Sequence, residues 1–139
     1  MSVFIPPVNL DIDLKLVRAN LFPIPPPPPN QKRSPQRKGH LLALSISIFN
    51  AGDAPIRLLG KKWLIDNHDG NHYVFESSHI FNVRPLLCSN QLFAINGFHE
   101  VTPPSNVFLT LFGRDNDGNI FRTATLNIHP PEKRKRTRR

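Results

Sequence analysis

The chain has 139 residues, enough for one domain with a modest hydrophobic core, and Leu, Ile, Val and Phe supply 44 of them. This apolar content, about a third of the chain, excludes an intrinsically disordered protein. The formal charge of +8 is concentrated in two short segments, 32–38 and 132–139, and the rest of the chain has a net charge of −1. We therefore expect a nearly neutral folded body that carries two basic extensions.

Cys88 is the only cysteine, so no intrachain disulfide can form and a reducing compartment is favoured. We expect it to be a packed or half-buried residue rather than a catalytic thiol. The chain contains no run of about 18 apolar residues and no cationic leader followed by an apolar stretch. These features predict a soluble cytoplasmic protein that does not contact a membrane.

Alternating apolar and polar residues predict the first two strands. A period of two turns one face of a strand toward the core and leaves the other in water. In residues 9–17 the apolar positions are Leu10, Ile12, Leu14 and Leu16. In residues 42–48 they are Leu42, Leu44, Ile46 and Ile48, and a turn-like sequence, Asn50-Ala51-Gly52-Asp53, follows.

A proline-rich basic segment, residues 22–39, separates these two predicted strands. Its five consecutive prolines, 25–29, cannot donate backbone hydrogen bonds and favour an extended polyproline helix. We interpret the segment as a stiff insertion loop. The alternative, a ligand for a proline-recognising domain, stays open because a preformed polyproline helix loses little entropy when it binds.

Five further strands are expected after Asn50, at residues 56–65, 73–76, 91–95, 107–112 and 120–128. Asp-Gly, Asn-Gly or Pro-Pro pairs separate several of them, and no window shows a convincing helical period. About seven short strands predict an all-β sandwich or barrel. Trp63 is expected in its core, and the alternative is an exposed contact for a partner protein.

Two aspartates and two histidines lie within seven positions: Asp66, His68, Asp69 and His72. Histidines four residues apart share a face on a helix, where they can chelate a metal ion. Asp69-Gly70 instead favours a two-residue hairpin turn, in which His68 pairs with Asn71 and Asn67 with His72. The two imidazoles then point to opposite faces, so no metal site is assigned.

The acidic turn 115–119, Asp-Asn-Asp-Gly-Asn, resembles the beginning of a calcium-binding EF-hand loop. Such a loop has glycine at its sixth position and glutamate at its twelfth, but Ile120 and Leu126 occupy them here. We therefore expect a second hairpin turn at Asp117-Gly118 and no calcium. The remaining histidines have no nucleophile or carboxylate at a diagnostic spacing, so no catalytic residue or cofactor site is assigned.

The basic segments supply the candidate binding residues. The C-terminal run places six cations in seven residues, enough to neutralise several phosphates. No aromatic residues are interleaved, so binding should follow the nucleic-acid backbone rather than the base sequence. The tail could instead be a solubilising segment, or a nuclear address in a eukaryotic host. The candidate nucleic-acid-binding residues are Lys32, Arg33, Arg37, Lys38, Lys133, Arg134, Lys135, Arg136, Arg138 and Arg139.

The residue pattern from Asn50 onward resembles the ApaG domain, which occurs as a small bacterial protein and as a module of some F-box proteins and of a DNA polymerase delta-interacting protein. The resemblance rests on the order and spacing of its motifs and extends over residues 9–131, with the tail 132–139 beyond it. The matching residues are Asn50-Ala51-Gly52, Leu58-Leu59 before Trp63, the turn from Asp66 to Gly70, Pro85-Leu86-Leu87, Phe93, Thr102-Pro103 and Asp115-x-Asp117-Gly118-x-x-Phe121.

The resemblance implies an immunoglobulin-like or fibronectin-III-like β-sandwich that acts as a protein-interaction module and has no settled enzymatic reaction. Bacterial members often carry a G-x-G-x-x-G, which has prompted the idea of phosphate binding. The corresponding positions here are Ser77, His79 and Asn82, so the glycine cradle for a phosphate is absent. The proline-rich loop and the basic tail are additions to the family pattern.

These observations lead to the hypothesis of a non-enzymatic adaptor. Its neutral body contacts another protein, while its basic extensions contact the backbone of a nucleic acid, with RNA in a large assembly such as a ribosome as the favoured target. One alternative is a pure protein-interaction domain without a nucleic-acid role. Another is a protein that binds or acts on a small phosphorylated or metal-bound ligand, which predicts a concave pocket with strongly shifted titrating groups.

Overall fold

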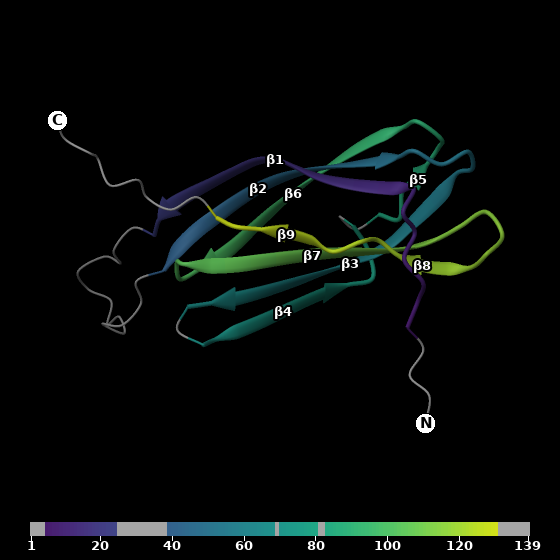
Figure 1. The fold of residues 1–139 in the computed structure, drawn as a ribbon. Helices are drawn as coiled ribbons and strands as arrows, with labels where there is room; N and C mark the ends of the chain where they lie inside the picture. The colour runs from purple at the N-terminus through teal and green to yellow at the C-terminus, as the bar shows by residue number, and fades with distance from the viewer. Residues whose placement is uncertain (1–4, 25–38, 69, 81–82, 131–139) are drawn as a thin grey trace, which may run out of the picture.

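The computed structural model of the chain describes residues 5–24, 39–68, 70–80 and 83–130. Within these ranges the chain forms nine β-strands, which make two antiparallel sheets packed face to face (Figure 1). The architecture confirms the expected all-β sandwich of the immunoglobulin or fibronectin-III type. No helix in these ranges is long and apolar enough to cross a bilayer.

The smaller sheet has three strands in the order β1-β2-β6: β1 (Ile12–Pro23), β2 (His40–Asn50) and β6 (Leu92–Val101). The path of the larger sheet is β4-β3-β7-β8: β4 (His72–Ser77), β3 (Ile56–Asn67), β7 (Ser105–Arg114) and β8 (Ile120–Arg122). Two short strands join this sheet beside that path, where β5 (Leu86–Leu87) pairs with β3 and β9 (Leu126–Ile128) pairs with β7.

The core lies between the two sheets and is built from every second residue of the long strands. In β2 and β7, buried residues alternate with half-buried ones, as a period of two requires. Trp63 of β3 is 3% exposed, which confirms its expected place in the core. Its indole lies opposite Gly97 of β6, where an added Cβ would come within 2.9 Å of ring carbon Cζ2. The indole therefore fills the space that a larger residue at position 97 would need.

Strand β1 follows the predicted alternation only in part. Ile12 is buried in the core as expected, but Leu10 precedes the strand and is 83% exposed. The prediction that Leu10 faces inward is therefore wrong. At its other end β1 runs further than expected, to Pro23, which pairs with His40 of β2. The connecting loop therefore begins after Pro23.

A bulge interrupts the alternation of β1. The register with β2 shifts between Leu16 and Arg18, which leaves Val17 as an additional residue in β1. Beyond it, Ala19 and Leu21 pack against the core, so the inward face moves from even to odd positions. A strict period of two could not have predicted this half of the strand.

The last predicted strand, residues 120–128, is divided into β8 and β9. Thr123 lies between them and is fully buried. Its N–H donates to Leu111 O at 2.9 Å, and its Oγ1 accepts the Leu111 N–H at 3.0 Å. Because a side-chain oxygen replaces one backbone partner, the chain stays beside β7 while its pairing register changes by one residue.

Strand β5 was not predicted, and it determines the position of Cys88. Leu87 is 1% exposed and pairs with Ile56 of β3. Successive residues of an extended segment face opposite sides, so Cys88 turns outward and is exposed. The expectation of a packed or half-buried cysteine is therefore wrong.

The N-terminal segment lies along the outer side of β8. Asn9 N–H donates to Arg122 O at 2.8 Å, and Arg122 N–H donates to Pro7 O at 2.9 Å. The Arg122 side chain adds a bond from Nε to Pro6 O at 3.0 Å. This end of the larger sheet is therefore covered.

Candidate functional site

All ten predicted nucleic-acid-binding residues lie outside the described residues, in segments 25–38 and 131–139. The structure does locate the points from which these two segments leave the fold. Segment 25–38 lies between Ile24 and Gly39, and Ile24 N–H donates to Gly39 O at 3.5 Å. The C-terminal segment follows Pro130.

Both points lie at the same end of the sandwich (Figure 1). At this end, His40 pairs with Val101, the last residue of β6. Thr102, which follows, donates its N–H to Asn67 Oδ1 at 3.0 Å. Asn67 in turn lines the same hollow as Pro130. These contacts and the shared hollow place the start of the C-terminal segment at the same end of the fold as the two ends of the proline-rich loop.

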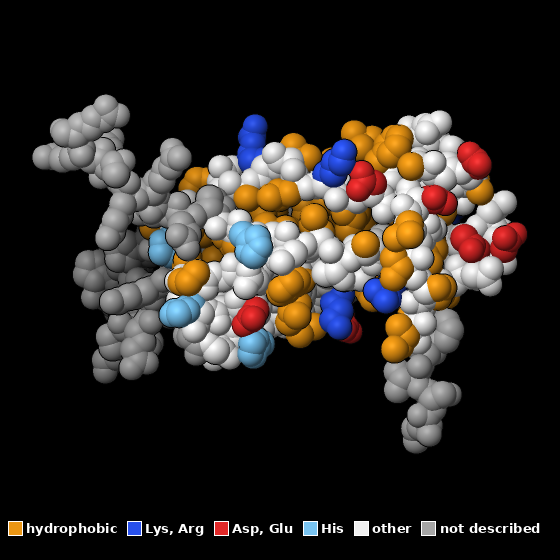
Figure 2. All heavy atoms as spheres, viewed as in Figure 1, with side chains coloured by type: hydrophobic (Ala, Val, Ile, Leu, Met, Phe, Trp, Pro, Cys, Tyr) orange, Lys and Arg blue, Asp and Glu red, His pale blue; other side chains and the backbone are white. Residues whose placement is uncertain are grey.

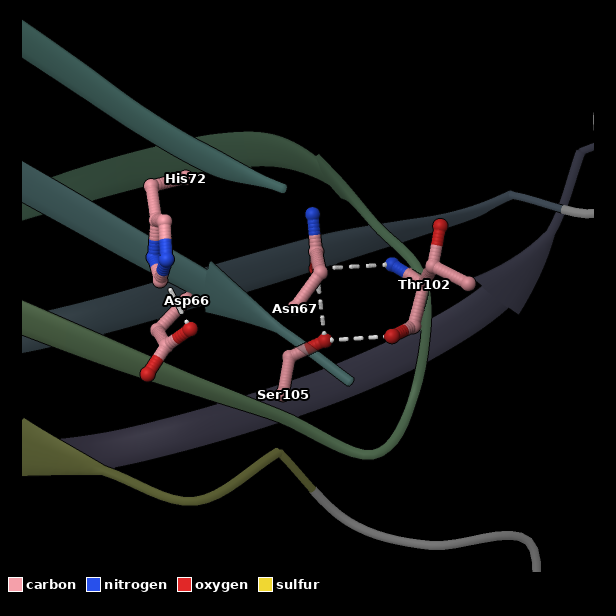
Figure 3. Close-up of polar contacts among 5 residues, drawn as sticks. All are labelled: Asp66, Asn67, His72, Thr102 and Ser105. Atoms are coloured by element: carbon pink, nitrogen blue, oxygen red, sulfur yellow. Dashed lines mark hydrogen bonds and ion pairs between the residues drawn. The ribbon is translucent and has the colours of Figure 1, made fainter. Parts of the chain in front are cut away.

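Asn67 holds this end of the molecule together. Its side chain is buried, and its Oδ1 accepts the Thr102 N–H (Figure 3). The Ser105 hydroxyl lies 2.8 Å from Asn67 Oδ1 and 2.8 Å from Thr102 O, and it donates to one of them at a time. One buried amide side chain therefore links the end of β3, the end of β6 and the start of β7.

The hairpin between β3 and β4 has a three-residue loop rather than the predicted two-residue turn. Asn67 N–H donates to Asn71 O at 3.0 Å, Gly70 N–H donates to Asn67 O at 3.0 Å, and Gly70 has a φ of 87°. A three-residue hairpin loop with glycine at its bulge position requires a positive φ at that glycine. The predicted pairing of His68 with Asn71 and of Asn67 with His72 is therefore wrong by one residue.

The corrected register brings Asp66 directly opposite His72. His72 Nδ1 lies 3.0 Å from Asp66 Oδ1, and both side chains are partly exposed (Figure 3). The carboxylate orients the imidazole toward the solvent face of the sheet. Among the described residues, no three metal-ligating side chains come together.

The hairpin at 115–119 has the same design. Asp115 N–H donates to Asn119 O at 2.9 Å, Gly118 N–H donates to Asp115 O at 3.1 Å, and Gly118 also has a φ of 87°. Asp115 Oδ1 accepts the N–H groups of Asp117 at 3.0 Å and Asn119 at 2.8 Å. This carboxylate therefore stabilises the turn, and the hairpin expected at Asp117-Gly118 is confirmed.

The solvent-facing side of the larger sheet carries three rows of side chains across β4, β3 and β7, which we call the outer face. The central row is apolar and consists of Val74, Leu64 and Phe108, which are paired directly. The rows on either side are Glu76, Lys62 and Thr110, and His72, Asp66 and Asn106. Figure 2 shows hydrophobic side chains on this side of the molecule with charged side chains around them.

Two hollows lie along this side. One, of about 250 Å³, is lined by Lys62, Leu64, Phe108, Thr110 and Thr125. The other, of about 260 Å³, lies at the end from which the extensions leave and is lined by Asp66, Asn67, His68, Pro104, Ser105, Asn106, His129 and Pro130. Its described lining contains no Lys or Arg, so it offers a phosphate little attraction of its own.

His99 lies between the sheets beneath β4. Its ring centroid is 4.5 Å from that of Trp63 and 5.6 Å from that of Phe75. Burial, and to a lesser extent the positive charge of Lys61, lower the pKa of His99 to about 4. The imidazole is therefore neutral at pH 7, and its buried Nε2 has no hydrogen-bond partner among the described residues.

The small-ligand alternative expects a pocket lined by a strongly shifted group. His99 does not line either of the two hollows. In the part of the chain that the structure describes, the shifted group and the hollows are therefore separate. A pocket and a strongly shifted titrating group therefore do not coincide in either of these two hollows.

The chain is similar to curated bacterial proteins named Protein ApaG. It is 33% identical over 58 residues to those of Escherichia coli (strain K12 / DH10B) and Shigella boydii serotype 18, an alignment that covers 42% of this chain and 46% of each relative. The chain thus spans about half the length of the curated relatives it matches. No protein-family model matches it. These similarities confirm the resemblance to ApaG proteins that the residue pattern indicated.

Two solved structures share the fold. An X-ray structure of a Northeast Structural Genomics Consortium target has a TM-score of 0.67 and 16% identity, covering 92% of this chain and 97% of that chain. A Bordetella pertussis protein, provisionally named ApaA, has a TM-score of 0.65 and 19% identity, covering 91% of this chain and 100% of that chain. At these identities the likeness shows the fold alone.

Proposed function

We propose that the protein is a non-enzymatic adaptor whose β-sandwich body binds another protein while its two basic extensions bind the phosphate backbone of a nucleic acid. RNA in a large assembly such as a ribosome is the favoured target, and the binding should follow the phosphate backbone because no aromatic residues are interleaved among the cations. The body has a net charge of −1 and contributes little attraction for a polyanion. The two roles are therefore assigned to different parts of the chain.

The observation that carries the nucleic-acid role is the shared origin of the two extensions. Segment 25–38 begins after Ile24, segment 131–139 begins after Pro130, and both points belong to one end of the sandwich (Figure 1). Cations that start from neighbouring points can contact successive phosphates of one strand. Extensions at opposite ends of the fold would have to bind two separate sites.

The outer face supports the protein-binding role. Its central apolar row is partly open to solvent, with Val74 54% exposed, and polar or charged residues flank it on both sides. An apolar centre with a polar rim is the usual composition of a protein interaction surface. The ion pair between Lys62 Nζ and Glu76 Oε1, at 3.8 Å, lies in that rim.

Binding of the full chain to a generic single-stranded RNA, measured over a range of salt concentrations, tests the nucleic-acid role. If most of the ten extension cations contact phosphates, the slope of log affinity against log salt should be about −6 to −9. Replacement of all ten with glutamine should bring the slope to between about −1 and 0 and should remove most of the affinity for RNA. Replacing only the four cations between 32 and 38 should change the slope by about 3.

A matched control keeps the extensions and removes cations from the body. Lys15→Gln together with Arg18→Gln, two exposed residues of β1, should change the slope by less than about 1. A ten-glutamine variant that binds RNA as tightly as the parent would overturn the role of the extensions. Equal losses of RNA affinity in the control and in the ten-glutamine variant would also overturn the role of the extensions.

The second candidate is a protein-interaction domain with no nucleic-acid role, which the apolar row of the outer face favours by itself. It expects the parent chain to bind RNA no more tightly than the ten-glutamine variant at about 0.15 M salt. The same salt series therefore decides between the two functions.

A further inference from the structure

Strand β4 is an open edge of the larger sheet. It pairs with β3 on one side, and no other strand of the described residues pairs with its far side. All six of its residues are exposed. The centre of the strand is apolar, with Tyr73 46%, Val74 54% and Phe75 50% exposed. An apolar edge without proline is a template for pairing with another strand.

The register of the hairpin shows which backbone groups of β4 are free to pair. Asn67 and Asn71 form a bonded pair next to the turn. Bonded pairs recur at every second residue of an antiparallel ladder, so Tyr73 and Phe75 direct their N–H and C=O groups toward β3. The intervening residues of the strand, His72, Val74 and Glu76, direct theirs toward the open edge. These three are also the β4 residues of the outer face.

We propose that β4 pairs with β4 of a second copy of this chain, in antiparallel orientation about a twofold axis at Val74. In this register Val74 faces Val74 of the second copy, and His72 faces Glu76 of the second copy. Each facing pair exchanges two backbone hydrogen bonds. The two larger sheets then form one continuous sheet, and both copies use the same surface, as a closed twofold interface requires.

The apolar side chains of the outer face are continuous across this axis. The row Phe108, Leu64, Val74 meets Val74 of the second copy and continues through its Leu64 and Phe108. Val74 is 54% exposed in a single copy, and pairing removes part of that apolar surface from water. The row therefore becomes twice as long and loses its open end.

The charged side chains also match. The adjoining row runs Lys62, Glu76, and then His72 and Asp66 of the second copy, so carboxylates alternate with cationic or donor groups. Within one copy the flanking contacts already exist, with Lys62 Nζ 3.8 Å from Glu76 and His72 Nδ1 3.0 Å from Asp66. The twofold axis repeats this row on both sides. No like charges face each other, and this self-complementarity favours a second copy over an unrelated strand.

On the inner side of β4, Tyr73 faces Phe75 of the second copy. This is the closely spaced kind of antiparallel pair, in which aromatic side chains add to stability. Phe75 already lies against His99, with ring centroids 5.6 Å apart, so its ring is oriented before the copies meet. The association therefore requires little rearrangement of either chain.

This self-association goes beyond the adaptor function and does not depend on nucleic acid. Because the two β4 strands run antiparallel, the ends from which the basic extensions leave point in opposite directions in the two copies. Failure of RNA binding would leave the pairing intact, and failure of the pairing would leave RNA binding by each copy intact. The two proposals can therefore be tested separately.

Sedimentation of the full chain tests the pairing. A six-residue edge contact buries a small area, so we expect a dissociation constant on the order of 10 to 100 µM. The weight-average mass should rise from 15.8 kDa toward twice that value between about 5 and about 500 µM protein at about 0.15 M salt. A mass that stays at 15.8 kDa up to about 500 µM overturns the proposal.

Val74→Pro tests whether β4 is the contact. The substitution removes an N–H that points to the open edge and is not needed for pairing with β3, so the hairpin should stay folded. Loss of the two hydrogen bonds at the axis should weaken the dimer about thirtyfold. The matched control is Phe98→Ala on β6, the edge of the smaller sheet, where the side chain is 66% exposed. It should leave the dissociation constant of the dimer unchanged. A dimer that survives Val74→Pro overturns the assignment to β4.

Two charge variants test the register without altering the backbone. Glu76→Lys alone brings a lysine against His72 of the second copy, and His72→Glu alone brings two carboxylates together. Each should weaken its own dimer about tenfold. An equimolar mixture pairs the new lysine with the new glutamate and keeps one native His72–Glu76 row, so it should associate within about threefold of the parent.

Asp13→Lys on β1 is the control for the charge change of Glu76→Lys, because it changes the charge by the same amount as that variant at another edge strand. It should leave the dimer unchanged. A mixture of the two charge variants that associates no more tightly than its components rules out the proposed register.

Discussion

Strands β4 and β8 end the path of the larger sheet at opposite sides, and each follows a hairpin of the same design (Figure 1). Both turns end in Asp-Gly-Asn, and both glycines have a φ of 87°. The outer side of β8, however, is hydrogen-bonded to the N-terminal segment through Arg122. The outer side of β4 has no such partner strand in the described part of the chain.

The difference shows that the turn does not decide whether an edge is protected. Strand β8 has three residues, and the segment that covers it contains Pro6 and Pro7, which have no N–H to offer to a further strand. Strand β4 has six residues with an apolar centre and no proline. Sheet proteins usually protect such an edge, so an unprotected one indicates a docking site. The predictions below alter one edge or its hairpin and compare it with the other.

Asn67→Ala should have the largest effect, because it removes the buried amide that fixes the hairpin before β4. The Thr102 N–H loses its acceptor and the Ser105 hydroxyl loses one of two, so the free energy of unfolding should fall by about 3 kcal/mol. Asp115→Ala is the equivalent change in the other hairpin. Water can reach the N–H groups that it frees, so it should cost about 1 kcal/mol. Equal losses in chemical denaturation would contradict the structural role of Asn67.

Removal of residues 1–9 should uncover β8. The chain loses two backbone hydrogen bonds and the side-chain bond of Arg122, so the free energy of unfolding should fall by about 2 kcal/mol. The Arg122 amide should then exchange its hydrogen faster, because its acceptor is Pro7 O. Amide exchange in β4 serves as the internal control and should not change. A truncated chain in which Arg122 keeps its protection would show that the segment does not cover this edge.

Acidic pH should lower the free energy of unfolding through His99, which lies beneath β4. The pKa of His99 in the folded protein is about 4, below its ordinary value of 6.5, so the fold favours the neutral imidazole. Stability should be full above pH 6.5 and should fall as the pH drops from 6.5 toward 4, because the unfolded chain takes up the proton first. Since the imidazole is only partly buried, we expect a loss of about 1 to 2 kcal/mol by about pH 4.5.

Denaturation of the parent and of His99→Leu at several pH values measures this effect. Leucine cannot take up a proton, so the variant should lose less stability than the parent between pH 6.5 and 4. Parallel pH profiles for the two proteins would show that His99 does not cause the acid sensitivity.

Gly70→Ala and Gly118→Ala should have the smallest effects and should match. Neither position has a heavy atom within 4 Å of an added Cβ, so the cost comes from the positive φ alone. Each change should lower the free energy of unfolding by about 1 kcal/mol. A difference between the two of more than about 0.5 kcal/mol in thermal or chemical unfolding would show that the hairpins are not equivalent.

Periodicity in the sequence was sufficient where a strand buries one face along its whole length. The core position of Trp63 was expected from its large aromatic side chain, and the buried positions of β3 change from even to odd before it. Strand β2 follows directly from its period of two. The bulge at Val17 and the break at Thr123 do not, because each depends on one tertiary detail. At Thr123 that detail is a single hydroxyl that accepts the Leu111 N–H. Local sequence contains no pattern from which such a contact could be predicted.

The outer face was not predicted because it depends on register. Asp-Gly is compatible with loops of two or three residues, and a shift of one residue moves every side chain of a strand to the other face. Once the bond from Gly70 N–H to Asn67 O sets the register, His72, Val74 and Glu76 lie directly opposite residues of β3. The pattern that could have indicated this face is the same order of a basic, an apolar and an acidic residue in β3 and in β4. The nucleic-acid-binding role of the ten basic residues stays a prediction from the sequence.

Amide hydrogen exchange in β4, measured at low and high protein concentration, tests the open edge most directly. We expect the amides of His72, Val74 and Glu76 to exchange rapidly in dilute protein and to become protected in concentrated protein. Those of Tyr73 and Phe75, which face β3, should be protected at both concentrations, and β8 should not change. Exchange rates at His72, Val74 and Glu76 that are equal at the two concentrations would show that the open edge of β4 does not pair with a second copy.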